Sequence, residues 1–258
     1  METRERSLWT PALRLLALLF AAVLGWSATE TSVSAMEFVV RTDDDGLRIV
    51  IARGLITAGD SARFRQVLAH AERDRFGNKR VALAGDGGLV GEAFGMAELM
   101  AEEKVSAVVL PGTACASACA TVVFVAGVHR YVLDRGRLGL HTCTDGRTRS
   151  APCNELIARR AERHGVPYAP FAAFLERADP TKTKWLGAEE ADCWGLTRWP
   201  PGSRTRAPHP GACPPISGAE PRLASVDAYL TGQASRSGVA SASRPSSRKV
   251  SDWAVDMP

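Results

Sequence analysis

Apolar residues in this chain first form short β-rich runs and then recur with the period of a helix. Residues 37–41 and 47–52 are β-rich runs, and the Asp-Asp-Asp-Gly sequence at 43–46 is typical of a hairpin turn. A calcium loop is the alternative, but the further ligand positions of an EF-hand are missing. Apolar residues then mark one face of a helix that starts near Asp60 or Ser61, namely Phe64, Val67, Leu68 and Ala71.

The same order of strand and helix then recurs. Residues 81–84 predict a buried strand, a glycine-rich turn follows, and the spacing of Met96, Leu99 and Met100 predicts a helix. Residues 105–110 predict the next strand. Strands that alternate with helices favour the α/β fold class, with a mainly parallel sheet and right-handed crossovers.

A candidate nucleophile and a candidate base follow this repeat. Ser117 lies in the sequence Cys-Ala-Ser-Ala-Cys at the start of an apolar helical segment, and His141 comes after two short extended segments. A serine at a helix N-terminus has its hydroxyl close to unpaired backbone N–H groups, which can stabilise an oxyanion. The alternative is a helix of small residues that packs tightly against a sheet.

The glycine-rich turn at 85–91 reads Gly-Asp-Gly-Gly-Leu-Val-Gly. Its third glycine is one place late for a dinucleotide-binding loop, so we expect neither a nucleotide nor any other cofactor. Glycine suits a turn in which the backbone must approach a substrate closely, although the same residues would also make a simple tight turn.

The order of these features from about Arg48 to Leu196 resembles the ClpP/crotonase superfamily. The Cys-Ala-Ser-Ala-Cys box is more narrowly similar to that of periplasmic ClpP-like proteins. The resemblance implies a spiral of β-β-α units, a mainly parallel sheet flanked by helices, and hydrolysis of a peptide or ester. It also implies the roles of the site residues: Ser117 as nucleophile, His141 as general base, and the backbone N–H groups of Gly87 or Gly88 and Ala118 as oxyanion hole.

A third catalytic residue is less clear from the sequence. The segment 185–196 resembles the one that closes the Clp-type domain, and the family's catalytic aspartate aligns with Thr183. Asp179 lies upstream and reaches His141 only if the loop bends. The chain therefore has a Ser-His dyad, a triad with Asp179, or no activity. A dyad is sufficient in principle, because a backbone carbonyl can also fix the histidine tautomer.

The N-terminal residues 1–35 are typical of a signal peptide. Three arginines precede an apolar run at 15–26 that is too short for a comfortable membrane span, and Val33-Ser-Ala35 offers a cleavage site before Met36. We expect a periplasmic or secreted protein; an uncleaved membrane anchor is the alternative.

Six cysteines agree with export, because disulfides form in oxidising compartments. Proximity in the sequence suggests the pairs Cys143–Cys153 and Cys193–Cys213. Cys115, Cys119, His141 and Cys143 also form a conceivable zinc site, although their spacing matches no common zinc module. We therefore expect at least two disulfides and no metal.

Composition sets the remaining limits. A chain of 258 residues with 45% hydrophobic content can bury one full core, which we assign to a domain at 36–200. The net charge is +4, and most of the excess lies in the Pro-, Ser- and Arg-rich residues 201–258, which predict a largely disordered tail. This tail lacks the dense basic and aromatic patch of a nucleic-acid site, so we expect no nucleic acid. Association with the cell envelope through the tail and a homo-oligomer both stay open.

Four functions are compatible with the sequence. A hydrolase that uses Ser117 and His141 is favoured, and a non-catalytic ClpP-like binding or scaffold protein is the main alternative. A crotonase-type enzyme would need an acyl-thioester coenzyme that is cytosolic, whereas this chain carries an export signal. The zinc site is the fourth hypothesis.

Overall fold

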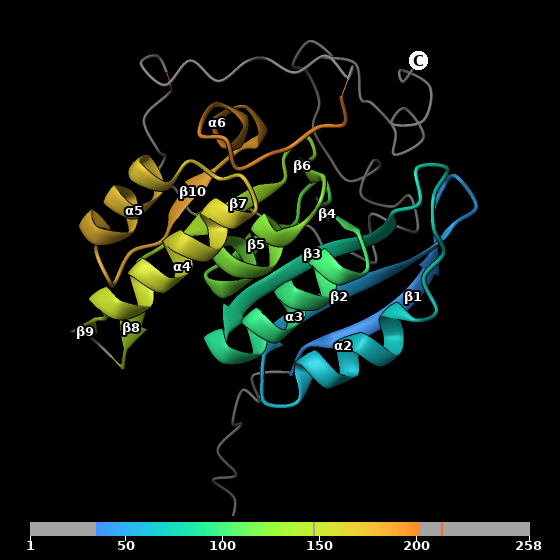
Figure 1. The fold of residues 1–258 in the computed structure, drawn as a ribbon, viewed down its shortest axis with the longest axis horizontal. Helices are drawn as coiled ribbons and strands as arrows, with labels where there is room; N and C mark the ends of the chain where they lie inside the picture. The colour runs from blue at the N-terminus through green and yellow to red at the C-terminus, as the bar shows by residue number, and fades with distance from the viewer. Residues whose placement is uncertain (1–34, 147, 202–212, 214–258) are drawn as a thin grey trace, which may run out of the picture. The chain divides into compact units, whose positions relative to one another are not determined.

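The structure, a computed structural model, describes residues 35–146, 148–201 and 213. Its larger sheet has the strand order β1 (Glu37–Thr42), β2 (Arg48–Ile56), β3 (Lys79–Gly88), β4 (Val105–Val109) and β6 (Arg130–Val132). β1 and β2 form the expected antiparallel hairpin, and all other neighbours in this sheet are parallel (Figure 1). Asp43 closes the hairpin turn, because its carboxylate accepts the N–H groups of Asp45 and Leu47 at 3.0 and 2.9 Å.

A smaller sheet has three strands, the first of which comes before β6 of the larger sheet in the chain order. Its strands are β10 (Lys184–Leu186), β7 (Arg137–Leu140) and β5 (Ala114–Ala116). β5 and β7 are parallel, with Ala116 opposite Gly139, whereas β10 is antiparallel to β7. A short ribbon of β8 (Thr144–Asp145) and β9 (Thr148–Arg149) follows β7.

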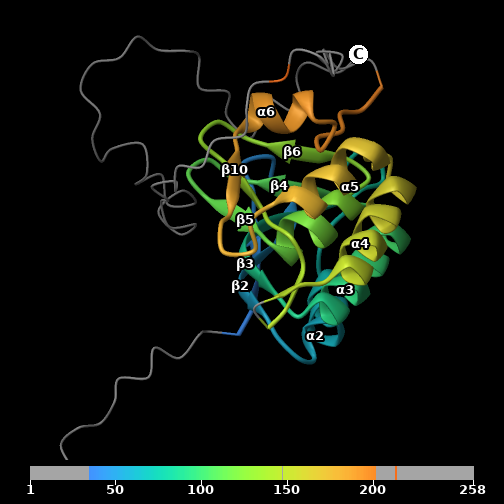
Figure 2. The same cartoon turned by 90° about the vertical axis from the view of Figure 1, so that its left-hand side faces the viewer.

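The helices connect these strands. They are α2 (Asp60–Leu68), α3 (Val90–Glu102), the π-helical turn η1 (Cys119–Val123), the 3₁₀ turn η2 (Phe124–Ala126), α4 (Ala151–Arg163), α5 (Tyr168–Arg177) and α6 (Ala188–Cys193). Figure 2 shows α2, α3, α4 and α5 on one side of the strands. This arrangement confirms the predicted α/β class, with a mainly parallel sheet flanked by helices. Within the described part of the chain, no helix is both long and apolar enough to cross a bilayer. The expected signal peptide (1–35) lies outside the described residues apart from Ala35, as does most of the expected tail.

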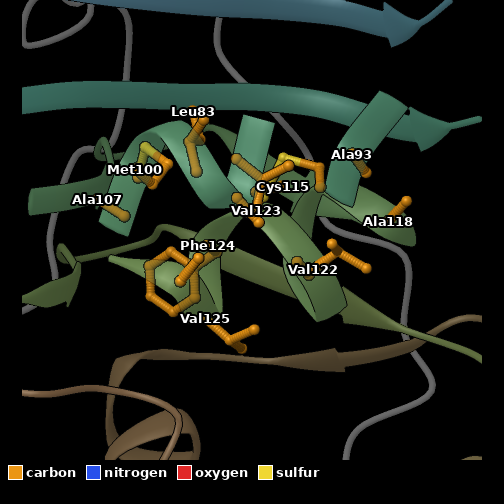
Figure 3. Packing of buried hydrophobic residues seen from close by; sticks show 14 of the residues in the cluster. Leu83, Ala93, Met100, Ala107, Cys115, Ala118, Val122, Val123, Phe124 and Val125 are labelled. Atoms are coloured by element: carbon orange, nitrogen blue, oxygen red, sulfur yellow. A yellow bond between two sulfur atoms is a disulfide. The ribbon is translucent and has the colours of Figure 1, made fainter. Parts of the chain in front are cut away.

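The main core forms where the helices meet the sheet. Leu83 of β3, Met100 of α3 and Phe124 of η2 are all at most 1% exposed and pack in one cluster (Figure 3). Every residue from Cys119 to Ala126 is buried, so the small-residue segment after Ser117 is part of this core.

A buried arginine ties the ends of three helical segments together. Arg130 is 1% exposed, and its guanidinium donates to the carbonyls of Val125, His164 and Leu196 at 3.1, 2.8 and 2.6 Å. Desolvation lowers the pKa of Arg130, yet a guanidinium stays charged at neutral pH. Carbonyls at helix C-termini carry partial negative charge, so they partly compensate the buried cation.

Candidate active site

Ser117 occupies a sharp turn from strand to helix. It follows β5 directly and precedes η1, and its φ of 54° lies in the left-handed region, where a residue with a Cβ is strained by about 1 kcal/mol or more. The surrounding hydrogen bonds hold this conformation. The Ser117 N–H donates to the carbonyl of Gly139 at 2.8 Å, and the Ser117 carbonyl accepts the N–H and hydroxyl of Thr121 at 2.8 and 2.9 Å. Strain of this kind concentrates at functional sites.

A disulfide joins the residues on either side of this turn. Cys115 in β5 and Cys119 in η1 are bonded, with their Cα atoms 5.4 Å apart, and both are at most 1% exposed. Figure 3 shows the sulfur–sulfur bond at Cys115 inside the hydrophobic core. The bond covers the side of the turn that faces the core, and Ser117 itself stays partly exposed. The turn is therefore closed covalently as well as by hydrogen bonds.

The C-terminal end of β3 lies against the Ser117 hydroxyl. Gly87 has a φ of 91°, and a Cβ built on it would come within 2.8 Å of both Ser117 Oγ and the backbone nitrogen of Ala118. Gly88 has a φ of 131°, and its Cβ would collide with the backbone of Ile56 in β2. The Ala118 N–H belongs to the first turn of the helical segment, where an intrahelical acceptor is missing. The structure thus brings together Ser117, Gly87 and Ala118, while their role as oxyanion donors stays a prediction.

His141 leaves the neighbouring strand at the same edge of the small sheet. Ala116 pairs with Gly139 in a parallel register, so the segments after β5 and β7 emerge side by side. The Nδ1 atom of His141 lies 2.6 Å from the carbonyl oxygen of Thr142. Because a carbonyl only accepts, this bond places the proton on Nδ1 and leaves Nε2 as the basic nitrogen. Among the described residues, no hydrogen bond joins Ser117 Oγ to His141.

Asp179 has other partners in this structure. Its carboxylate accepts the hydroxyl and the N–H of Thr181 at 2.7 and 2.9 Å and lies 3.4 Å from Lys182 Nζ. The Thr181 hydroxyl contributes most to lowering the pKa of Asp179, followed by the Thr181 N–H and Lys182. No hydrogen bond between Asp179 and His141 occurs in the part of the chain that the structure describes. A role for Asp179 as third catalytic residue stays a prediction.

Thr183 occupies the place beside His141 instead. A methyl group on Gly139 would lie 2.9 Å from Thr183 Cγ2, so Thr183 borders the strand that leads to His141. β10 and β7 pair with Lys184 opposite Leu140, and one further step in this register puts Thr183 opposite His141. Thr183 carries no charge, and the hydrogen-bond partner that the structure gives His141 Nδ1 is the Thr142 carbonyl.

One buried polar residue near His141 escaped the sequence analysis. Asn154 of α4 is 2% exposed and bonds to the segment that follows His141. The sequence held a weak signal for it, because Asn154 precedes Ile157, Ala158 and Ala161 on the apolar face of a helix, where a polar residue needs partners.

The six cysteines form three disulfides: Cys115–Cys119, Cys143–Cys153 and Cys193–Cys213. The expected disulfides are confirmed, and they indicate an oxidising, non-cytoplasmic environment. The four residues of the conceivable zinc site supply no free thiolate, since its cysteines are divided between two disulfides. Among the described residues, no cluster of three or more His, Cys, Asp or Glu could hold a metal ion.

Comparison with known proteins finds similarity of structure only. No family model and no curated protein matches the sequence. A serine-to-alanine mutant of the 1510-N membrane-bound stomatin-specific protease is 18% identical, with 57% of this chain and 75% of that chain covered and a TM-score of 0.46. ClpP1 from Listeria monocytogenes is 18% identical over 53% of this chain and 78% of its own, with a TM-score of 0.42. The ClpP protease catalytic domain from Plasmodium falciparum is 13% identical over 55% and 78%, with a TM-score of 0.43.

Proposed function

We propose that this chain is an exported ClpP-like serine hydrolase that cleaves a peptide or ester. Ser117 is the nucleophile and His141 the general base, and the backbone N–H groups of Ala118 and of Gly87 or Gly88 are the oxyanion donors. The observation that carries the proposal is the left-handed Ser117 at a strand-to-helix turn, with Gly87 and the Ala118 nitrogen packed around its hydroxyl. A serine in a plain packing role would need neither the strain nor the neighbouring glycine.

The chemistry follows from these groups. His141 Nε2 takes the Ser117 proton as the oxygen attacks the substrate carbonyl, and the imidazolium then gives that proton to the leaving group. The negative charge on the tetrahedral intermediate lies on the carbonyl oxygen, which the backbone N–H groups stabilise. Water then attacks the acyl-enzyme while His141 Nε2 takes its proton. That proton passes to Ser117 Oγ as the acyl–oxygen bond breaks and the acid product leaves. The Thr142 carbonyl accepts a hydrogen bond from Nδ1–H throughout, which is the orienting role that a carboxylate has in a triad.

Export is part of the same proposal. Residues 1–35 are the signal peptide, and the mature protein begins at Met36 in the periplasm or outside the cell. Three disulfides support an oxidising compartment.

A non-catalytic scaffold of the cell envelope is the second candidate. Two observations on the described residues favour it: Ser117 Oγ makes no hydrogen bond with His141, and the Asp179 carboxylate is engaged by Thr181 and Lys182. Catalytic hydrogen bonds are often long without substrate, so the first observation does not decide between the two candidates.

Covalent labelling distinguishes them. A fluorophosphonate probe should modify the wild-type mature protein at Ser117 and leave Ser117→Ala unmodified. His141→Ala should label more slowly by several orders of magnitude. In hydrolysis assays, the double variant Ser117→Ala/His141→Ala should be scarcely less active than either single variant, because Ser117 and His141 act as a unit. His70→Ala is the matched control, since His70 lies on the exposed surface after α2, and it should label at the wild-type rate. Equal labelling of wild type and Ser117→Ala would favour the scaffold.

A further inference from the structure

We propose that Asn154, in the N-terminal turn of α4, is a positioning residue that holds the segment Thr142–Cys143 and through it the imidazole of His141. The inference deepens the proposed function, since it concerns the base of the same site. Asn154 is not a catalytic residue here, because its amide contacts the segment that follows His141 and the carbonyl of Leu175 on α5, not the reacting groups.

The side-chain amide of Asn154 is fully engaged. Its Nδ2 donates to Thr142 Oγ1 at 2.7 Å and to the Leu175 carbonyl at 3.3 Å, while its Oδ1 accepts the Cys143 N–H at 2.7 Å. One side chain therefore pairs with one donor and one acceptor on the segment that follows His141, and with one acceptor on α5. Substitution of Asn154 by alanine or leucine would leave these buried groups without hydrogen-bond partners.

Thr142 transmits this constraint to the histidine. It is 0% exposed, and its two oxygen atoms have separate partners: the hydroxyl accepts from Asn154, and the carbonyl accepts from His141 Nδ1 at 2.6 Å. The bonds with Asn154 hold the Thr142 side chain and the Cys143 N–H. The Cys143 N–H and the Thr142 carbonyl belong to the same planar peptide group, so the orientation of that carbonyl is fixed as well. The tautomer of His141 thus depends on a chain of bonds that starts at Asn154.

The backbone and a disulfide hold α4 against the same segment. The Ser150 N–H donates to the Cys143 carbonyl at 2.9 Å, the Asn154 N–H donates to the Ser150 carbonyl at 3.0 Å, and Cys143 is bonded to Cys153. The disulfide limits how far the segment can move from α4. The bonds that act directly on the Thr142–Cys143 peptide are those with Asn154 Oδ1 and His141 Nδ1.

The test uses substitutions that separate the hydroxyl of Thr142 from its volume. Thr142→Val keeps the shape and removes the acceptor, Thr142→Ser keeps the hydroxyl, and Asn154→Ala removes the amide. Asn78→Ala is the control, because Asn78 is also a buried asparagine. It directly precedes β3, and its side-chain amide lies 3.5 Å from the ring of His129, not of His141. All variants are compared below their own melting temperatures, so that lost stability and lost positioning are measured separately.

Two measurements are made on each variant: the pH-dependent rate of fluorophosphonate labelling, and the tautomer of His141 from the nitrogen shifts of its ring. We expect Thr142→Val and Asn154→Ala to lose the Nδ1–H tautomer and to label about 10- to 100-fold more slowly, since small misplacements of catalytic groups have such effects. Thr142→Ser and Asn78→Ala should retain the tautomer and label at close to the wild-type rate.

The two proposals fail in different ways. A wild-type protein that does not label defeats the hydrolase but leaves the tautomer measurement, which still tests the positioning role. If Thr142→Val and Asn154→Ala fold and keep both the wild-type tautomer and the wild-type labelling rate, Asn154 does not position His141.

Discussion

Gly87 shows how a single missing Cβ shapes the candidate site. Its φ of 91° is one that L side chains rarely adopt, and a methyl group there would lie 2.8 Å from Ser117 Oγ and from the Ala118 nitrogen. The space beside the nucleophile exists only because this residue is glycine, and the proposed oxyanion would need that space.

Gly87→Ala should therefore lower both stability and reactivity. We expect a loss of about 1–3 kcal/mol in the free energy of unfolding from backbone strain, and a loss of at least about tenfold in the rate of fluorophosphonate labelling. Urea unfolding and labelling kinetics measure the two effects.

Gly91→Ala is the matched control for this substitution. Gly91 lies in α3, nothing lies within 4 Å of a Cβ built on it, and alanine favours a helix by about 0.5–1 kcal/mol over glycine. This control should be as stable as wild type or more so, and should label normally. A Gly87→Ala protein with the labelling rate of wild type would show that the glycine has only a turn-forming role.

At the level of elements, α3 supplies the cap that α2 lacks. The N-cap of α2 is Gly59, which has no side chain that could accept a hydrogen bond from the first N–H groups of the helix. Glu92 in the first turn of α3 accepts instead the Gly59 N–H at 3.0 Å and the Ser61 N–H and hydroxyl at 2.9 and 2.7 Å. These hydrogen bonds lower the pKa of Glu92 to about 2, and the bond from the Ser61 hydroxyl contributes most. The two helices are thereby joined by a carboxylate at a helix N-terminus.

This cap predicts a pH-dependent stability. A carboxylate with a depressed pKa stabilises the folded state fully above its ordinary pKa of 4.5, and this contribution is lost as the pH falls through about 2. Glu92→Gln should therefore be less stable than wild type at pH 7, and the difference should shrink below pH 4.5 and disappear near pH 2. Thermal unfolding across this pH range measures it.

Glu102→Gln removes the same charge from the other end of α3 and serves as the control. Glu102 is exposed, and the described residues offer its carboxylate no hydrogen bond. Its substitution should change stability little at any pH. A Glu92→Gln difference that is constant from pH 7 to pH 2 would contradict the capping role.

Much of the whole molecule was predictable because its elements follow local periodicity. The β1–β2 hairpin came from two β-rich runs and the Asp-Gly turn between them, and the start of α2 near Asp60 came from the spacing of apolar residues. The meeting of Gly87, Ser117 and Ala118 was predictable from chain order and family resemblance. Gly87 lies at the C-terminal end of β3, although the sequence predicted a turn there, and Ser117 and Ala118 directly follow β5.

Other features depend on contacts that no local pattern encodes. Cys115 and Cys119 are bonded across a turn whose left-handed serine brings β5 and η1 together, and their spacing alone does not reveal this geometry. Asn154 meets Thr142 only after α4 has folded back on the segment after β7. Asp179 follows α5, and the local bonds to Thr181 determine where its carboxylate points.

The proposed export and the three disulfides together predict a definite covalent state. When the full chain is expressed with an intact secretion route, the recovered protein should begin at Met36 and contain no free thiol. Intact mass under non-reducing conditions, followed by peptide mapping, measures both properties. A recovered chain that still begins at Met1, or one with four or more free thiols, would contradict the proposed compartment.

The three disulfides have one further consequence, for assembly in the cell. Each disulfide joins two cysteines that are consecutive among the six, with separations of 4, 10 and 20 residues. No disulfide loop therefore encloses or crosses another. A chain that enters an oxidising compartment N-terminus first exposes the two partners of each bond before the next pair arrives. An oxidant that joins thiols in their order of emergence thus produces the native set directly, and the protein should mature without a disulfide isomerase.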